Sequence, residues 1–312
     1  DAILIAPATR DLLASYLHGL QHGPILMSLS AARTRNCPVM MIPSMHADLA
    51  DDPVTSELVT EVEKLGIKVH WGQENEGKRK TPPHDEIVAR FSHYVNRLKP
   101  NRKSVVITLG ATRSPIDDIR YVQNTSSGAT GFQIADYLHR HGHDVTCVAG
   151  LTNYTRPEWL PLTLSADKPD DMLAELNALA NDEIDAWVHA AAVLDYVVKS
   201  PAEGKLASQQ GLLTVELIES SKHILELKKK CSDAVRIGFK LETGIKQKEL
   251  VRRAFSQLEY AEMTAVVANR LEDINDDTKP RAYLVDSTGA DYTLQTMLDV
   301  CVAITTIIER GV

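Results

Sequence analysis

Short apolar runs alternate with amphipathic stretches along nearly the whole chain. Continuous apolar runs are typical of strands buried on both faces of a parallel sheet, whereas apolar residues spaced three and four apart are typical of helices packed on that sheet. In the first hundred residues this pattern predicts strands near 2–8, 38–45 and 67–71, and helices near 11–20, 53–65 and 85–98. Further along it predicts strands near 104–109, 144–149, 185–193, 235–241, 264–268 and 281–285, with helices between them. The pattern therefore indicates an α/β protein.

The alternation breaks at two places. The segment 72–83 is rich in charge and ends in two prolines, and the polar stretch 99–103 precedes a new apolar run. Both features are typical of loops and linkers. We therefore expect one domain over 1–98, ending in a linker helix, and a second over 103–312. On that helix we expect one apolar face made of Ile87, Val88, Phe91, Tyr94, Val95 and Leu98.

The composition is that of an ordinary globular protein. Of its 312 residues, 44% are hydrophobic and 24% are charged. The net charge of −8 and the 5% of aromatic residues disfavour nucleic-acid binding, because the chain repels phosphate backbones and offers few rings for stacking. The four cysteines show no metal-ligand spacing, which indicates reduced thiols. No apolar run approaches the ~18 residues of a membrane span, so we expect a cytoplasmic protein without a membrane partner.

The segment 107–131 carries the strongest local signal for chemistry. Its sequence, ITLGATRSPIDDIRYVQNTSSGATG, ends a predicted strand at Gly110 and opens a predicted helix with SSGATG at 126–131. Glycines at such a junction let backbone N–H groups and the positive end of the helix dipole approach an anion, usually a phosphate. Arg120 and Asn124 add a cation and an amide that suit a substrate with carboxylate and phosphate groups. A tight turn capped by Ser126 explains the same residues without a ligand.

A second candidate segment lies at 189–208, HAAAVLDYVVKSPAEGKLAS. It follows a predicted strand, and open α/β sheets bind ligands at the carboxyl ends of their strands. The small residues at 190–192 leave room for a ligand to approach the backbone. Asp195 is placed to hold a ribose or a divalent cation, and Lys205 to reach phosphates from a glycine-bearing loop. The alternatives are a capping role for Asp195 and a solvated surface lysine at position 205.

These two segments and three others resemble one enzyme family. The run 110–131, AAAVLDY at 190–196, Gly204-Lys205, GFKLET at 238–243 and VVAN at 266–269 resemble phosphopantothenate–cysteine ligase. IAPAT at 5–9 and PVMMIPSMHADLADDP at 38–53 resemble the later part of the flavin-dependent phosphopantothenoylcysteine decarboxylase, which precedes the ligase in many bacterial and archaeal fusions. The resemblance implies a Rossmann-like, doubly wound, mostly parallel sheet in the ligase domain, preceded by a partial flavodoxin-like α/β domain.

The resemblance also implies roles for individual residues. The nucleotide phosphates would lie against Gly110, Ser126, Gly128 and Gly131, with Lys205 on the triphosphate and Phe239 and Asn269 bordering the nucleotide. Phosphopantothenate would contact Arg120, Asn124, Ala191, Ala192 and Asp195. The implied catalytic residues are Asn124, Asp195 and Lys205, and Asp195 is the candidate Mg²⁺ ligand.

The implied reaction joins 4′-phosphopantothenate to L-cysteine in coenzyme A biosynthesis. CTP or ATP, with Mg²⁺, activates the carboxylate as an acyl nucleotide, and the cysteine amine then displaces the nucleotide. The implied assembly is a homodimer through the ligase domain, in which Arg120 reaches the partner's site. A higher oligomer is expected where the flavoprotein domain also assembles.

Several residues depart from the family pattern. Lys240-Leu241 stands where bacterial ligases commonly have an alanine pair, which leaves the choice between CTP and ATP open. In the first domain, Arg10-Asp11 follows the PAT motif and His46 replaces a usual asparagine. The family's flavin-phosphate loop and catalytic histidine would precede Asp1. We therefore expect an N-terminally truncated decarboxylase domain, in which FMN binding and decarboxylation need the preceding segment.

Two other classes of function compete with the ligase. A nicotinamide-dependent oxidoreductase uses the same kind of sheet, but no G-x-G-x-x-G follows the strand at 104–109, and the next strand ends in Ala149-Gly150-Leu151 without an acidic residue. A non-catalytic nucleotide-binding scaffold would suit the altered first domain. Against it, the candidate residues Asn124, Asp195 and Lys205 are all present.

Overall fold

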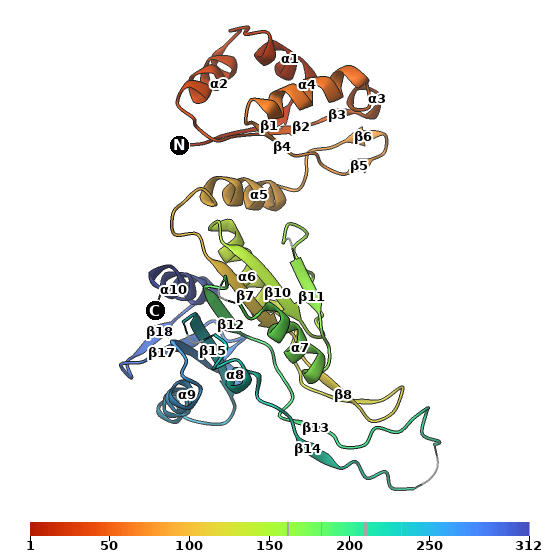
Figure 1. Ribbon diagram of the computed structural model, residues 1–312, viewed down its shortest axis with the longest axis vertical. Helices are drawn as coiled ribbons and strands as arrows, with labels where there is room; N and C mark the ends of the chain where they lie inside the picture. The colour runs from red at the N-terminus through yellow and green to blue at the C-terminus, as the bar shows by residue number, and fades with distance from the viewer. Residues whose placement is uncertain (161, 182, 209–210, 232, 312) are drawn as a thin grey trace. The chain divides into compact units, whose positions relative to one another are not determined.

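The computed structural model describes residues 1–160, 162–181, 183–208, 211–231 and 233–311 (Figure 1). The chain divides into two compact units, Asp1–Leu98 and Lys99–Val312, and each is described by itself. No helix in the described ranges is long and apolar enough to cross a membrane.

The first unit is built on a small parallel sheet of β1 (Ile3–Ala8), β2 (Val39–Pro43) and β4 (Lys68–Val69), in that order. One face packs Met41 and Val39 against helices α1 (Arg10–Leu17), α2 (Pro24–Thr34) and α4 (Pro53–Lys64). The other face packs Met40 and Ile42 against Ile87 of α5 (His84–Asn96). A short antiparallel sheet of β3 (Met45–His46), β6 (Lys78–Arg79) and β5 (Glu74–Asn75) and the one-turn helix α3 (Ala47–Ala50) complete the unit.

Two sequence expectations for this unit need correction. The predicted apolar face of α5 is narrower than expected, since Val88 is 49% and Leu98 is 63% exposed. Val88 lies about 100° around the helix from the buried Ile87, and Leu98 lies beyond the last helical residue. Helix α2 was not predicted, although Gly23 before Pro24 is a favourable start for a helix.

The second unit is an eight-stranded sheet in the order β11-β10-β7-β12-β15-β16-β17-β18. The first six strands run parallel to one another, β17 pairs antiparallel with β16, and β18 pairs antiparallel with β17. Counted along the chain, the parallel strands lie in the order 3-2-1-4-5-6, which is the doubly wound Rossmann order. The predicted fold class is therefore confirmed. The strands are β7 (Ser104–Leu109), β10 (Asp144–Ala149), β11 (Leu162–Ser165), β12 (Ala186–His189), β15 (Val235–Glu242), β16 (Ala265–Arg270), β17 (Ala282–Asp286) and β18 (Asp291–Leu294).

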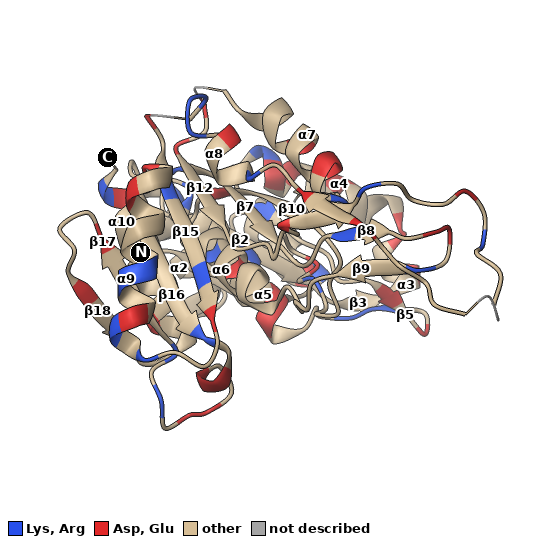
Figure 2. Ribbon diagram, turned by 90° about the horizontal axis from the view of Figure 1, so that it is seen from below, with Lys and Arg blue, Asp and Glu red and all other residues tan. Residues whose placement is uncertain are grey.

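Helices cover both faces of this sheet because successive residues of a strand point to opposite sides. Ile107 and Val267 pack with α6 (Ala129–Arg140) and α10 (Met297–Arg310). Val106 packs with α7 (Pro169–Leu179) and the segment after α8 (His223–Glu226), and Val266 packs with α9 (Gln247–Ala261). On α9, acidic and basic residues lie side by side (Figure 2), and its exposed arginines pair with Glu249 one turn away.

Two short hairpin-like pairs extend from the sheet where loops were expected. β8 (Arg113–Pro115) pairs with β9 (Tyr121–Gln123), and β13 (Tyr196–Val198) pairs with β14 (Leu217–Glu219). Strands of three residues are too short for hydrophobic alternation to reveal them. The strand predicted over 185–193 ends at His189, and a single bridge between Ala111 and Ala192 continues its pairing.

Candidate functional site

The candidate site lies at the carboxyl ends of β7 and β12, which are neighbours at the centre of the sheet. After β7 the chain leads through α6 to β10 on one side, whereas after β12 it leads to β15 on the other. This reversal of strand order opens the crevice in which doubly wound sheets bind their ligands. Both predicted segments, 107–131 and 189–208, therefore meet at this position.

Backbone hydrogen bonds join the two segments directly. The Ala192 N–H donates to Gly110 O at 2.8 Å, and the Thr112 N–H donates to Ala192 O at 3.2 Å. The hydroxyl of Thr112 accepts the N–H of Leu194 at 2.8 Å. Neither Thr112 nor Leu194 was predicted as a site residue, since nothing in the sequence alone pairs positions so far apart.

Asn124 closes this junction from the β9 side. Its Nδ2 donates to Ala192 O at 3.2 Å and to Val193 O at 3.0 Å, and its backbone N–H donates to Thr112 O at 3.4 Å. The structure thus brings Asn124 and Ala192 together, as the resemblance implied. Because its amide N–H groups bind carbonyls of the second segment, Asn124 holds the two segments in register.

Glycines permit the close approach of the loops at this edge. Gly110 has φ +78° and Gly128 has φ +79°, values that favour glycine. A Cβ on Gly110 would lie 2.6 Å from Leu151 O, and a Cβ on Gly128 would lie 2.6 Å from Thr152 Cγ2. Gly131 differs, since a Cβ there would lie 2.3 Å from Leu109 Cβ. Its missing side chain lets α6 pack against β7, which is a packing role beside its predicted phosphate role.

The residue at the N-cap position of α6 is Gly128 rather than Ser126. As a glycine, Gly128 makes no capping bond from a side chain. Ser126 Oγ accepts the N–H of Gly128 at 3.4 Å, and Ser127 Oγ accepts the N–H of Ala129 at 3.3 Å. The explanation of Ser126 as the helix cap is therefore wrong. The first turn of a helix leaves N–H groups without intrahelical partners, and these groups suit an anion.

Asp117, which the sequence did not single out, organises the loops of Arg120 and Lys205. Its buried carboxylate accepts the N–H groups of Ile119 (2.8 Å), Arg120 (2.7 Å) and Leu206 (3.0 Å), and it pairs with Arg120 Nη1 at 2.5 Å. Burial raises the pKa of Asp117, but these donors and the guanidinium outweigh it and lower the pKa to about 2. The carboxylate is therefore a fixed anion. The sequence alone could not identify Asp117, because its burial and its hydrogen-bond donors exist only in the folded chain.

Asp195 and Lys205 are exposed. Both lie on the segment that contains β13 and β14, residues 195–208 and 211–220, which we call the arm. The backbone O of Asp195 accepts the Ser220 N–H at 2.8 Å, which fixes the base of the arm. Within the described ranges, no group of three His, Cys, Asp or Glu side chains could hold a metal ion. A single carboxylate fits Mg²⁺ only where phosphate oxygens and water complete the coordination.

Phe239 lies in the middle of β15, opposite Val267, and Asn269 lies near the end of the adjacent strand β16. Phe239 packs on the core and Asn269 is 9% exposed. When the Asn269 amide is assigned the orientation that satisfies both of its ends, Nδ2 donates to Lys240 O at 3.3 Å and Oδ1 accepts from Arg281 Nη1 at 3.2 Å. Arg281 Nη2 also donates to Thr130 Oγ1 of α6 at 3.0 Å. Arg281 is a basic residue at this edge that sequence reasoning missed.

A family model, the DNA/pantothenate metabolism flavoprotein C-terminal domain, matches residues 101–309, which is most of the chain. The chain belongs to this family. A second model, described as flavoprotein, matches residues 1–96. The resemblance found in the sequence is thus confirmed at the level of the family. The expectation of a truncated first domain is corrected in one respect, because a flavoprotein domain is present at residues 1–96.

Named relatives of this family agree with the two matches. The coenzyme A biosynthesis bifunctional protein CoaBC of Thermococcus kodakarensis is 33% identical over 273 residues, 87% of this chain and 67% of that protein. CoaBC of Haemophilus influenzae is 29% identical over 253 residues, 78% of this chain and 62% of that protein. The chain therefore spans 62% to 67% of the length of these relatives. A crystal structure of the C-terminal domain of CoaBC has a TM-score of 0.56 and 26% identity, covering 69% of this chain and 97% of that one.

In the flavoprotein domain, the residues that depart from the family pattern, Arg10 and His46, lie at or near the surface. Arg10 Nη1 pairs with Asp52 at 2.8 Å, and Thr9 caps α1 by accepting the Leu12 N–H at 3.1 Å. His46 is exposed at the start of α3. A phosphate nest needs free backbone N–H groups, and the serine-containing stretch 28–32 offers none because it lies inside helix α2.

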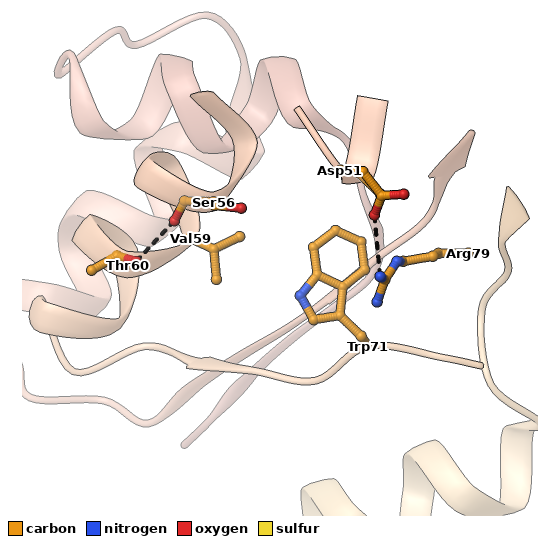
Figure 3. Close-up of a pocket in the computed structure, with 7 residues that line it drawn as sticks. Asp51, Ser56, Val59, Thr60, Trp71 and Arg79 are labelled. Atoms are coloured by element: carbon orange, nitrogen blue, oxygen red, sulfur yellow. Dashed lines mark hydrogen bonds and ion pairs between the residues drawn. The ribbon is translucent and has the colours of Figure 1, made fainter. Parts of the chain in front are cut away.

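A pocket in this domain lies beside Trp71 (Figure 3). The guanidinium carbon of Arg79 lies 5.5 Å from the centre of the Trp71 ring, and Arg79 Nη2 donates to Asp51 Oδ1 at 3.2 Å. The other residues that line this pocket are Ala50, Ser56, Val59 and Thr60. None of these was a predicted site residue.

Proposed function

We propose that the chain is a phosphopantothenate–cysteine ligase that acts in coenzyme A biosynthesis. The observation that carries the proposal is the joined pair of segments at the switch point, where Asn124 binds the Ala192 and Val193 carbonyls beside the glycine-rich start of α6. A doubly wound sheet offers this position to a nucleotide. The family match and the CoaBC relatives support the same reaction.

In the proposed reaction an oxygen of the phosphopantothenate carboxylate forms a bond to the α-phosphorus of the nucleoside triphosphate. The bond from that phosphorus to the bridging oxygen breaks, and pyrophosphate leaves. The cysteine nitrogen then forms a bond to the acyl carbon, the bond to the nucleotide oxygen breaks, and the nucleoside monophosphate leaves while the nitrogen loses a proton to water. Both steps need charge stabilisation and positioning rather than a covalent enzyme intermediate.

The residues divide this work by their place in the fold. Backbone N–H groups near Gly110, Ser126, Gly128 and Gly131 donate to the phosphate oxygens, while Lys205 brings a mobile positive charge from its exposed loop. Ala191 and Ala192 leave space for phosphopantothenate, and Asn124 lies beside that space. Arg120 supplies a cation to the site of the partner subunit. Phe239 and Asn269 border the nucleotide.

Asp195 is the residue that would hold Mg²⁺, together with phosphate oxygens of the nucleotide. Bound there, Mg²⁺ would neutralise phosphate charge. CTP and ATP both remain candidate nucleotides, since Lys240-Leu241 departs from the bacterial pattern. The proposed assembly is a homodimer of the ligase domain, with a higher oligomer where the flavoprotein domain assembles.

Pyrophosphate release tests this function. The purified chain is assayed with CTP and with ATP, each in the presence and absence of 4′-phosphopantothenate and L-cysteine. We expect release that requires phosphopantothenate, and a product that requires cysteine. Nucleotide binding without pyrophosphate release would instead support a scaffold, and reduction of a nicotinamide cofactor would support an oxidoreductase.

We propose that the flavoprotein domain at residues 1–96 binds FMN weakly. The altered residues Arg10 and His46 and the helical position of 28–32 support this proposal.

A further inference from the structure

Arg281 connects two parts of the site that lie on different elements. It directly precedes β17, which runs antiparallel to β16, so it lies at the edge where the parallel strands end. Its backbone N–H donates to Gln295 O at 3.2 Å. Its side chain donates from Nη2 to Thr130 Oγ1 at 3.0 Å and from Nη1 to Asn269 Oδ1 at 3.2 Å. The guanidinium therefore lies between the first turn of α6 and the end of β16.

The positive charge of this guanidinium has no acidic partner in the described part of the chain. Burial alone lowers the pKa of Arg281. Arg270, at the end of the neighbouring strand, is different, because its Nε donates to Asp273 Oδ2 at 2.6 Å. Removing a cation from water without an anion costs free energy, and here the cation also lies beside the positive end of the α6 dipole. The guanidinium and the N-terminal end of α6 therefore place two positive charges close together, and an anion bound between them would offset the free-energy cost.

We propose that Arg281 binds a phosphate group of the nucleotide at the N-terminal end of α6. This inference rests on the proposed ligase function and adds a residue to it. A guanidinium has five N–H donors, so the bonds to Thr130 and Asn269 leave donors for phosphate oxygens. Those two bonds also fix its plane, in contrast to the exposed Lys205. Arg281 thus gives the triphosphate a fixed position, while the flexible side chain of Lys205 follows the phosphate charge as it moves during the reaction.

Calorimetric titration of the whole chain tests the inference. The ligands are CTP, ATP, inorganic pyrophosphate and 4′-phosphopantothenate, and the variants are Arg281→Gln and Arg281→Lys. We expect Arg281→Gln to weaken nucleotide and pyrophosphate binding by about tenfold or more, since it removes a charge-assisted bond, and Arg281→Lys to weaken it less. Arg252→Gln, an exposed arginine on α9, is the control and should change binding less than about twofold.

The two phosphate sources give different results. Loss of affinity for phosphopantothenate with unchanged nucleotide binding would overturn the assignment to the nucleotide. If the parent chain binds neither CTP nor ATP, the ligase function itself fails. If the parent binds a nucleotide and Arg281→Gln binds it equally well, only the role of Arg281 fails.

A melting experiment separates binding from a merely structural role. A ligand that binds only the folded state raises Tm. At one pyrophosphate concentration, the rise in Tm should be equal in the parent and in the Arg252→Gln control and clearly smaller in Arg281→Gln. A lowered Tm in Arg281→Gln with an unchanged pyrophosphate effect would show that the arginine is structural. If Arg281→Gln does not fold, Thr130→Ala removes one group that orients the guanidinium, and unchanged pyrophosphate binding in that variant would overturn the inference.

Discussion

The carboxylate of Asp117 accepts the backbone N–H of Leu206 at 3.0 Å, and this bond ties the Lys205 loop to the turn between β8 and β9. Two backbone bonds strengthen the connection, from Ala202 N–H to Ile116 O at 2.9 Å and from Asp118 N–H to Gly204 O at 3.3 Å. The exposed Lys205 side chain therefore extends from a loop whose backbone is fixed. Its charge is mobile only over the length of the side chain.

Asp117→Asn is expected to lower ligation, measured as kcat/KM, by about tenfold or more. The amide cannot accept all four donors that the carboxylate holds, so the Lys205 loop loses its fixed position. Asp118→Asn, the exposed neighbour, is the control and should retain parental activity. Because the folded pKa of Asp117 is lowered to about 2, its contribution is present above the usual aspartate pKa and is lost only as pH falls toward 2. Loss of this anchor between pH 5 and 8 would contradict the assignment.

Lys205→Gln is expected to leave the fold intact and to lower ligation by about a hundredfold or more. An exposed lysine contributes little to stability, whereas a charge on the phosphates can supply ~3 kcal/mol in the transition state. The matched control is Lys199→Gln, on the same arm, where the lysine pairs with Glu216 at 2.8 Å. Steady-state pyrophosphate release measures both variants, and near-parental turnover in Lys205→Gln would remove its role.

Asn124→Asp is expected to abolish acyl-nucleotide formation. The new carboxylate would replace an N–H donor that two carbonyls share, and it would place negative charge near the substrate carboxylate and the phosphates. Gln123→Glu, one residue earlier and exposed on β9, adds the same charge without that contact and should remain active. Trapping of the acyl nucleotide without cysteine measures the step. Parental pyrophosphate release by Asn124→Asp would show that the residue is misassigned.

Gly131→Ala is expected to destabilise the second unit by about 1–3 kcal/mol, because the new methyl group would lie 2.3 Å from Leu109 Cβ. Gln133→Ala, at an exposed position of the same helix, should change the free energy of unfolding by less than about 0.5 kcal/mol. Urea unfolding of the whole chain measures both. Equal stability of Gly131→Ala and its parent would mean that α6 does not pack closely on β7.

FMN is expected to bind this chain weakly, and its phosphate to add little affinity. The serine-containing stretch 28–32 lies inside α2, where helical hydrogen bonds use the backbone N–H groups that a phosphate would need. Titrations of FMN and riboflavin, followed by absorbance and fluorescence, should give affinities within about threefold of each other. Stoichiometric FMN binding together with carbon dioxide release from phosphopantothenoylcysteine would contradict this expectation.

Long periodic elements could be predicted from the sequence, and pairings between distant residues could not. The strands β7 and β10 were predicted at their observed bounds, because buried runs of six residues carry a strong signal. The three-residue strands β8, β9, β13 and β14 carry none. Single-residue chemistry drew attention to Asn124, but its partners are backbone carbonyls 68 and 69 residues away. Asp117 and Arg281 were missed for the same reason, since their environments exist only after the sheet forms.

The central position of β7 has a consequence for synthesis of the chain. β7 is the first strand of its sheet to be made, yet its partners are β10 and β12, which end at Ala149 and His189. Until the ribosome has released residues up to 189, one apolar edge of β7 stays open to other chains. A protein truncated between β10 and β12 should therefore aggregate rather than form a smaller domain. The same late pairing joins Gly110 to Ala192. The step that forms the ligand crevice is therefore also the step that covers the open edge of β7.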